Sequence, residues 1–291
     1  MRLSQYQVDT YRSEGYLFLP ELFRPPEITV LKREASRVFQ DDEPGRVFER
    51  DSNLVRSVYG SHMYNDIFLR LCSHPRVAEP AMQILGSNVY VHQFKINAKA
   101  AFGGEQWEWH QDYIFWLRRD GMLEAKAMTA AVFLDDVTEF NGPIILIAGS
   151  HREGVLEGNN RQTDISGAED KSGTHVVWRS DLAARLTFTV DHETIAHLVR
   201  NSKLVAPKGP AGSCLFFDCN TVHSSGSNMS PFDRGMALIT FNSIDNKLAD
   251  VQDPRPQFLA SRTYDPISVL PDDSLMQEVA LPRAQFRGLE P

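Results

Sequence analysis

The stretch "GMALITFNSI", residues 235–244, carries the pattern that decides the fold of this chain. It is a short apolar run rich in residues that favour strands, and it lies between polar turns. Four other runs have the same character: "NVYVHQFKI" (88–96), "MTAAVFLDDV" (128–137), "PIILIAG" (143–149) and "SCLFFD" (213–218). Gly, Pro, Asn or Asp bound each run, as expected of strand ends. Because no helical segment follows every strand, we predict a jelly-roll or sandwich rather than βαβ units.

Helical segments are expected around this β core. Residues 4–14 and 26–40 show helical periodicity, and residues 63–85 show it with a break at Pro75, where a backbone donor is lost. The polar, glycine-containing segment 152–200 includes a further predicted helix near 191–201. We predict one domain over 1–291, with this insertion acting as a lid or as a plain surface excursion.

The composition is that of a soluble globular protein, with 42% hydrophobic and 23% charged residues. A formal net charge of -8 provides no basic surface for phosphates, so nucleic acid is not expected as a partner. The first residues are polar and no apolar run reaches 18 residues, so neither a signal peptide nor a membrane span is predicted. We expect a cytoplasmic protein, and the sequence gives no indication of its oligomeric state.

The aromatic stretch "WEWHQDYIFW", residues 107–116, contains His110 and Asp112 two positions apart. If residues 107–113 form a strand, both side chains project from the same face. His223, just beyond "SCLFF", would complete the two-histidine, one-carboxylate set of non-haem Fe(II) oxygenases. That set leaves coordination positions open for a chelating 2-oxo acid and dioxygen. Arg234 follows eleven residues after His223, where its guanidinium could hold the far carboxylate of 2-oxoglutarate.

A His-x-Asp pair alone is weak evidence, and two other interpretations remain open at this stage. The chain could be a non-catalytic jelly-roll module that binds a small ligand. It could also be a zinc hydrolase that uses the same three ligands, although Arg234 would then have no evident role.

The runs at 89–116, 132–151 and 222–234 resemble the phytanoyl-CoA dioxygenase superfamily, and the similarity extends over about residues 5–265. Within it, the chain is similar to ectoine hydroxylases and, more closely, to free-leucine 5-hydroxylases of bacterial peptide-antibiotic pathways. The resemblance implies a double-stranded β-helix of the cupin-like, jelly-roll type. It also implies Fe(II) at His110, Asp112 and His223, with 2-oxoglutarate held by Arg234.

The resemblance also implies a lining for the pocket. Near the co-substrate we expect Asn97, Lys99 and Ser225, and near the substrate we expect Gln93, Phe115, Trp116, Arg56 and His62. Arg56 and His62, from "VRSVYGSH", would be candidates for holding a substrate carboxylate. A solvated strand face remains the alternative for Gln93, Asn97 and Lys99, and a core position remains the alternative for Trp116.

Departures from the ectoine hydroxylases bear on the substrate. Those enzymes have Ser and Phe-Glu-Thr around the metal aspartate, whereas this chain has Gln111 and Tyr113-Ile114-Phe115. The more apolar wall suits an aliphatic side chain. We therefore predict hydroxylation of an unactivated C–H bond of a free, leucine-like amino acid in secondary metabolism. Proline, a basic amino acid and an ectoine-like solute are the alternatives.

Overall fold

Two antiparallel sheets face each other in the computed structural model, which describes residues 1–49, 52–160 and 186–277. The larger sheet has the strand order β1-β11-β6-β13-β4-β3-β2, and the smaller has the order β10-β7-β12-β5. This arrangement, with helices outside it, confirms the predicted mainly β jelly-roll core. The strands are β1 (Tyr16–Leu19), β2 (Arg46–Phe48), β3 (Val55–Tyr59), β4 (Val89–Lys99), β5 (Trp107–His110), β6 (Ala127–Phe133), β7 (Ile144–Ile147), β8 (Asn159–Asn160), β9 (Phe188–Thr189), β10 (Leu204–Val205), β11 (Cys214–Asp218), β12 (His223–Ser225) and β13 (Arg234–Ser243).

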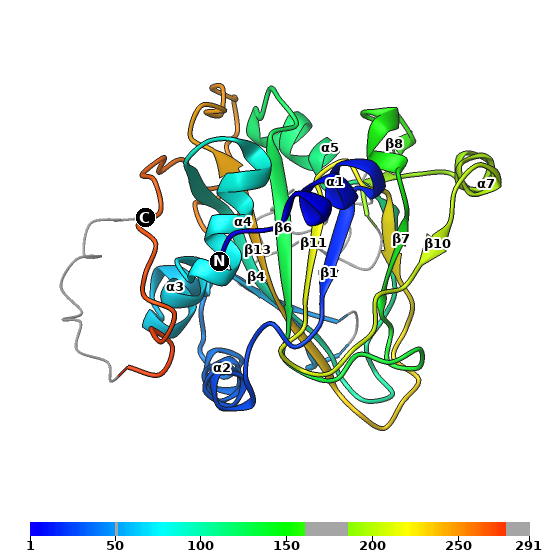
Figure 1. Cartoon of the computed structure of the whole chain (residues 1–291). Helices are drawn as coiled ribbons and strands as arrows, with labels where there is room; N and C mark the ends of the chain where they lie inside the picture. Colours follow the sequence, from blue (N-terminus) through cyan, green and yellow to red (C-terminus); the bar gives the residue numbers. More distant parts are fainter. Residues whose placement is uncertain (50–51, 161–185, 278–291) are drawn as a thin grey trace.

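The larger sheet is covered on both faces, and its side chains alternate between them with the period of two that a strand imposes. In β13, Ala237, Ile239 and Phe241 pack toward the helices, whereas Met236 and Leu238 pack toward the smaller sheet. Figure 1 shows α2, α3 and α4 on one side of the larger sheet and β7 and β10 on the other. The helices are α1 (Gln5–Glu14), α2 (Pro25–Val38), α3 (Asp66–Cys72), α4 (Pro75–Leu85), α5 (Tyr113–Phe115) and α7 (His192–Arg200), with short 3₁₀ turns at Ser61–Met63 and Ser150–Glu153 and a π-helical turn at Trp116–Asp120.

Local sequence signals account for where the helices begin and end. Ser4 and Gln7 form a capping box at the start of α1, and proline occupies the first turn of α2. The expected break near residue 75 is present, since α3 ends at Cys72 and α4 begins at Pro75. Helix α7 begins after Asp191, whose carboxylate accepts a hydrogen bond from the Thr194 amide. The predicted flanking helices are confirmed.

Residues 107–113 do not form one strand, so the condition for a shared strand face is not met. Strand β5 ends at His110, and the chain turns so that Asp112 stands at the start of α5. The Tyr113 amide donates to the Cys219 carbonyl at 3.0 Å instead of continuing a strand ladder. His110 and Asp112 therefore do not share a strand face, although the turn brings them together by another route.

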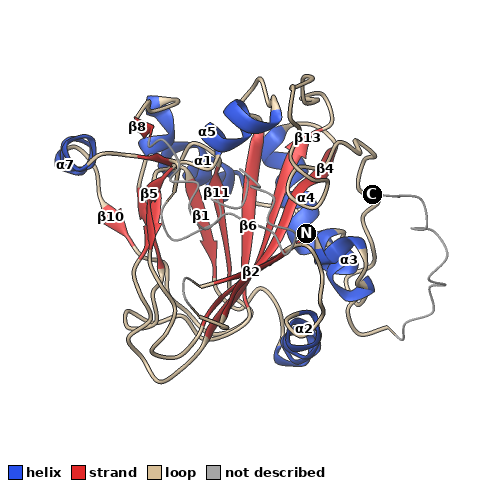
Figure 2. Ribbon diagram, turned by 180° about the vertical axis from the view of Figure 1, so that it is seen from behind, coloured by secondary structure: helices blue, strands red, loops and turns tan. Residues whose placement is uncertain are grey.

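The 152–200 insertion is described only at its two ends, because residues 161–185 lie outside the described residues. Its role as a lid and the single-domain organisation over 1–291 stay predictions. Figure 2, seen from behind, shows β5, β10 and α7 on the side of the molecule away from α3. None of the helices in the described ranges has the length and apolar character needed to cross a bilayer.

Candidate active site

Three buried residues meet at the β5–β12 strand pair of the smaller sheet. His110 ends β5 and His223 begins β12, and the two residues are direct partners across this antiparallel strand pair. Their ring centroids lie 4.2 Å apart. The turn after β5 brings Asp112 Oδ1 to 3.7 Å from His110 Nε2. One ligand atom from each of the three buried side chains lies within 4.8 Å of the others. The structure thus brings together the three predicted ligands.

The donor set fits a divalent metal ion. His110 Nδ1 donates to the Glu108 carbonyl at 2.7 Å, and His223 Nδ1 donates to the Thr221 carbonyl at 2.9 Å. Both Nε2 atoms are then left with lone pairs directed at the site, as in metal-binding histidines. Asp112 stands at a helix N-cap position but makes no capping bond, so its carboxylate is available. In the described part of the chain, no fourth metal-ligating side chain joins the cluster.

The electrostatics favour the ligand forms of these groups. Burial alone would raise the pKa of Asp112, but the charge of Lys95 and contacts with the two imidazoles lower it below its usual range. Burial and then the nearby His110 lower the pKa of His223 to about 4. A carboxylate and a neutral imidazole are the states that coordinate a metal.

The guanidinium of Arg234 is a second buried group at this site. Arg234, at the first position of β13, is 2% exposed, and its Nη2 donates to the Gly142 carbonyl at 2.7 Å and to Ser225 Oγ at 3.1 Å. Its Nε has no partner, and no carboxylate lies within 4 Å of the guanidinium in the described ranges. Burial lowers the pKa of Arg234 to about 10. Because an unpaired buried charge is costly, this pocket suits a carboxylate group of a ligand.

The polar residues of β4 share the inner face of the larger sheet. A β-bulge at His92, between the pairs Thr240–Gln93 and Phe241–Val91, shifts the alternation next to the site. Downstream of the bulge, Lys95, Asn97 and Lys99 point inward with Gln93. Strand alternation places Lys95 on this face with the other three residues, and its charge acts on Asp112.

Lys99 and Asn97, like Gln93 described below, make hydrogen bonds to other parts of the protein. Lys99 Nζ donates to the Glu105 and Gly226 carbonyls at 2.5 and 2.6 Å, which ties together two loops beside Arg234. Burial, followed by the charges of Arg234 and Arg56, lowers the pKa of Lys99 to about 6. Asn97 Oδ1 accepts a hydrogen bond from Ser57 Oγ at 2.7 Å.

Aromatic side chains flank the metal-binding cluster on the α5 side. Phe115 lies edge-on to the His110 ring, with centroids 6.3 Å apart, and also contacts Phe188 at 5.1 Å. Trp116 is 3% exposed and packs edge-on against His92 at 5.3 Å. Gln93 Nε2 donates to the Leu259 carbonyl at 2.7 Å, which fixes the C-terminal segment beside this wall.

A buried ion pair that the sequence did not reveal stands behind Trp116. Asp120, at the end of the π-helical turn, receives hydrogen bonds from Arg255 at 2.7 and 2.6 Å. Its Oδ2 lies 3.4 Å from His92 Nε2. The only signal in the sequence was a pair of charges far apart in the chain, and their contact depends on the fold.

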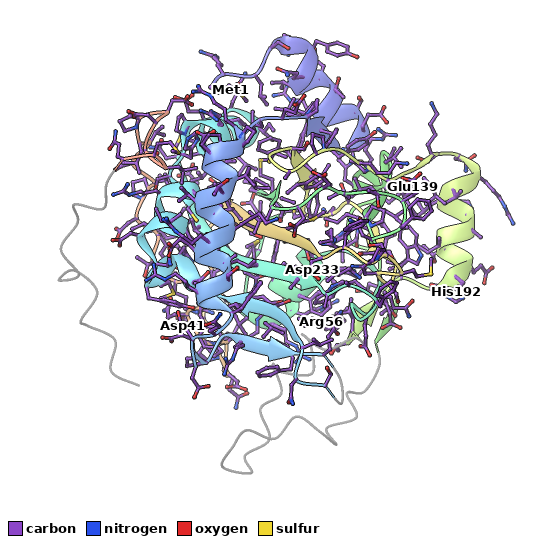
Figure 3. All side chains as sticks on the ribbon, turned by 90° about the horizontal axis from the view of Figure 1, so that it is seen from below. Met1, Asp41, Arg56, Glu139, His192 and Asp233 are labelled. Atoms are coloured by element: carbon purple, nitrogen blue, oxygen red, sulfur yellow. The ribbon has the colours of Figure 1, made fainter. Side chains whose placement is uncertain are left out.

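Arg56 and His62 occupy different surroundings. Arg56 is the extra residue of a bulge in β3, and its Nη1 pairs with Glu49 Oε2 at 2.7 Å while the guanidinium stacks 3.8 Å over Trp107. It lies toward the middle of the view from below, with His192 at the edge on α7 (Figure 3). The His62 ring packs on Phe94 at 5.4 Å, on the helix side of β4. The structure therefore does not bring His62 to the metal-binding cluster.

Comparisons with known proteins agree with this geometry. A model of the family described as phytanoyl-CoA dioxygenase (PhyH) matches residues 11–236. L-proline trans-4-hydroxylase of Streptomyces griseoviridis is 36% identical over 265 residues, covering 91% of this chain and 95% of that protein. Ectoine dioxygenase of Bordetella bronchiseptica is 36% identical over 267 residues, covering 89% and 83%. The structure of EctD from S. alaskensis with 2-oxoglutarate and 5-hydroxyectoine has a TM-score of 0.74 at 31% identity, covering 89% of this chain and 84% of that one.

Proposed function

The chain belongs to the phytanoyl-CoA dioxygenase family and is an Fe(II)- and 2-oxoglutarate-dependent hydroxylase, and from this premise we propose that its substrate is a free, leucine-like amino acid. The predicted family, enzyme class and cofactors are confirmed, which sets aside the binding-module and zinc-hydrolase alternatives. The relatives act on proline and ectoine according to their names, so a leucine-like substrate and a place in secondary metabolism stay predictions.

We assign the iron to His110, Asp112 and His223 and the far carboxylate of 2-oxoglutarate to Arg234 and Ser225. When bound, iron and 2-oxoglutarate activate dioxygen, so that the co-substrate becomes succinate and carbon dioxide while one oxygen atom enters a substrate C–H bond. The chain's own contribution is to orient the ligands, to neutralise the co-substrate and to exclude water. The unpaired Nε of Arg234 supports this assignment, because it leaves a buried donor for an anion.

The observation that carries the substrate proposal is the apolar wall beside the metal-binding cluster. Ile114, Phe115 and Trp116 are all less than 8% exposed, and Phe115 contacts the ring of His110 itself. An aliphatic side chain placed there would bury apolar surface at about 25 cal/mol per Å². A charged side chain would find no partner on this wall.

A carboxylate on the substrate has a complementary group nearby. Lys95 is half-buried on the inner face of β4, and its Nζ lies 5.9 Å from the Trp107 ring. No carboxylate lies within 4 Å of this ammonium in the described ranges, although its charge acts on Asp112. A free amino acid combines the carboxylate and the aliphatic chain that the two regions favour.

Proline and ectoine are the second candidates, because relatives with 36% identity bear the names of their hydroxylases. Both are small molecules with a carboxylate on a nitrogen-containing ring that includes saturated carbon atoms. They would meet the same Lys95 and the same apolar wall. Few pocket changes separate such substrates, since a methylene group changes discrimination by only about 1 to 3 kcal/mol.

The deciding experiment is a succinate-release screen of the iron-loaded protein over the free amino acids and ectoine, with mass spectrometry of the products. We expect a product 16 mass units heavier than leucine or a close aliphatic analogue. If proline or ectoine is turned over faster than leucine, the proposal of a leucine-like substrate is wrong and that second candidate takes its place. If every free amino acid and ectoine fail while a carrier-bound amino acid reacts, the proposal of a free substrate is wrong.

A further inference from the structure

The residue between the two metal-binding positions of the first loop is Gln111, and its side chain is 1% exposed. Its Nε2 donates to the Gly154 carbonyl at 2.7 Å and to the Asn220 carbonyl at 2.6 Å. Its Oε1 accepts from the Leu156 amide at 2.8 Å. Both amide protons and one oxygen lone pair are therefore used, and every partner is a main-chain atom.

These partners belong to two separate segments that matter for the site. Asn220 lies in the turn between β11 and β12, three residues before the ligand His223. Gly154 and Leu156 lie at the stem of the 152–200 insertion, where the chain leaves the 3₁₀ turn. The loop that carries His110 and Asp112 is thus joined through one side chain to the loop that carries His223 and to the insertion stem.

Among the described residues, few contacts other than the strand pair and the Ser224 hydroxyl, which donates to the Trp107 carbonyl at 2.8 Å, hold the two metal-binding loops in register. The Tyr113 amide donates to the Cys219 carbonyl at 3.0 Å. The ladder between β5 and β12 is short and is interrupted by a register shift after His223. Loss of the Gln111 amide would also remove the partner of three main-chain groups, of which the Asn220 carbonyl bond is buried and the Gly154 and Leu156 bonds are part-buried, so the loops would have to move to satisfy them.

We propose that Gln111 is a positioning residue that sets the spacing of the metal ligands and couples that spacing to the insertion stem at residues 154–156. The inference rests on the proposed metal assignment and extends it. A ligand set held at the correct spacing before the ion arrives binds it more tightly, and loss of such supporting contacts costs about 10- to 100-fold in affinity.

The test compares Gln111→Met with Gln83→Met, a matched change at a second glutamine. Gln83 in α4 also bridges to main-chain atoms, donating to the Leu3 carbonyl at 3.0 Å and accepting from its amide at 2.8 Å, far from the metal site. Methionine keeps the volume and removes the hydrogen bonds. Anaerobic calorimetric titration with Co(II) measures the affinity without turnover.

We expect Gln111→Met to weaken Co(II) binding about 10- to 100-fold and Gln83→Met to change it less than twofold. Hydrogen exchange should accelerate at residues 153–158 in Gln111→Met alone. If Gln111→Met does not fold, Gln111→Asn, which retains a shorter amide, should show a smaller loss of affinity in the same direction. Affinity within twofold of the wild type in the folded variant overturns the positioning role. A wild-type protein that binds no Co(II) overturns the metal assignment itself.

Discussion

Replacing Arg234 by glutamine tests the co-substrate pocket most directly. The guanidinium is buried and donates to Gly142 and Ser225, and among residues 1–49, 52–160 and 186–277 its Nε has no partner and no carboxylate lies beside it. A charge-assisted pair with a ligand carboxylate contributes about 1.5 to 3 kcal/mol. At about 1.4 kcal/mol per factor of ten, Arg234→Gln should raise the KM for 2-oxoglutarate about 10- to 150-fold. The KM for the amino-acid substrate should change less than twofold.

The assay follows succinate at varied 2-oxoglutarate and saturating iron. Arg234→Lys keeps the charge but loses the planar fork, so its KM should lie between the two. Arg37→Gln, on the exposed face of α2 with its side chain 72% exposed, is the control and should match the wild type. If a folded Arg234→Gln protein keeps a KM for 2-oxoglutarate within twofold of the wild type, the co-substrate carboxylate is not held by this group.

Three further outcomes are expected. Saturating Mn(II) or Co(II) should raise the Tm of the metal-free protein by about 5 °C, as measured by differential scanning fluorimetry, and His223→Ala should abolish the rise because it removes a ligand. Gly142→Ala should destabilise the protein by about 1 to 3 kcal/mol in urea unfolding and raise the KM for 2-oxoglutarate, because φ is +71° and a Cβ there would strike the Gly226 carbonyl. Burial lowers the pKa of His62 to about 4. Because the unfolded chain binds a proton at this residue below about pH 6.5 and the folded protein does so only near pH 4, the free energy of unfolding falls between these two pH values. His62→Phe should therefore lose up to about 2 kcal/mol less stability than the wild type between pH 7 and pH 5, and equal losses in the two proteins would contradict the buried neutral state.

The sequence was most informative where local signals suffice. Strand-like runs such as 235–244 correspond to β13, and the helix starts expected near Ser4 and Pro75 are those of α1 and α4. The end of β5 at His110 was missed, because the aromatic residues around it fit neither a strict strand period nor a helix. That end depends on the bond from Tyr113 to Cys219, which is a contact between distant segments.

The same division holds within the site. The spacing of His110, Asp112 and His223, together with the family resemblance, placed them in one cluster that the structure contains. The position of the Arg56 side chain could not be predicted from its own segment. Its pairing with Glu49 and its inward direction both depend on a bulge that is set by the register between β2 and β3. The triple contact of Gln111 was hidden for a similar reason, since its partners are main-chain atoms of remote loops.

Each imidazole of the cluster is steered by a carbonyl only two residues upstream in its own segment, Glu108 for one and Thr221 for the other. The local backbone therefore fixes the orientation of both rings before a metal ion binds. We expect the protein to stay folded when a chelator removes the iron, and we expect ferrous salts to restore its activity. In a cell short of iron, such a protein would lose activity long before it lost abundance.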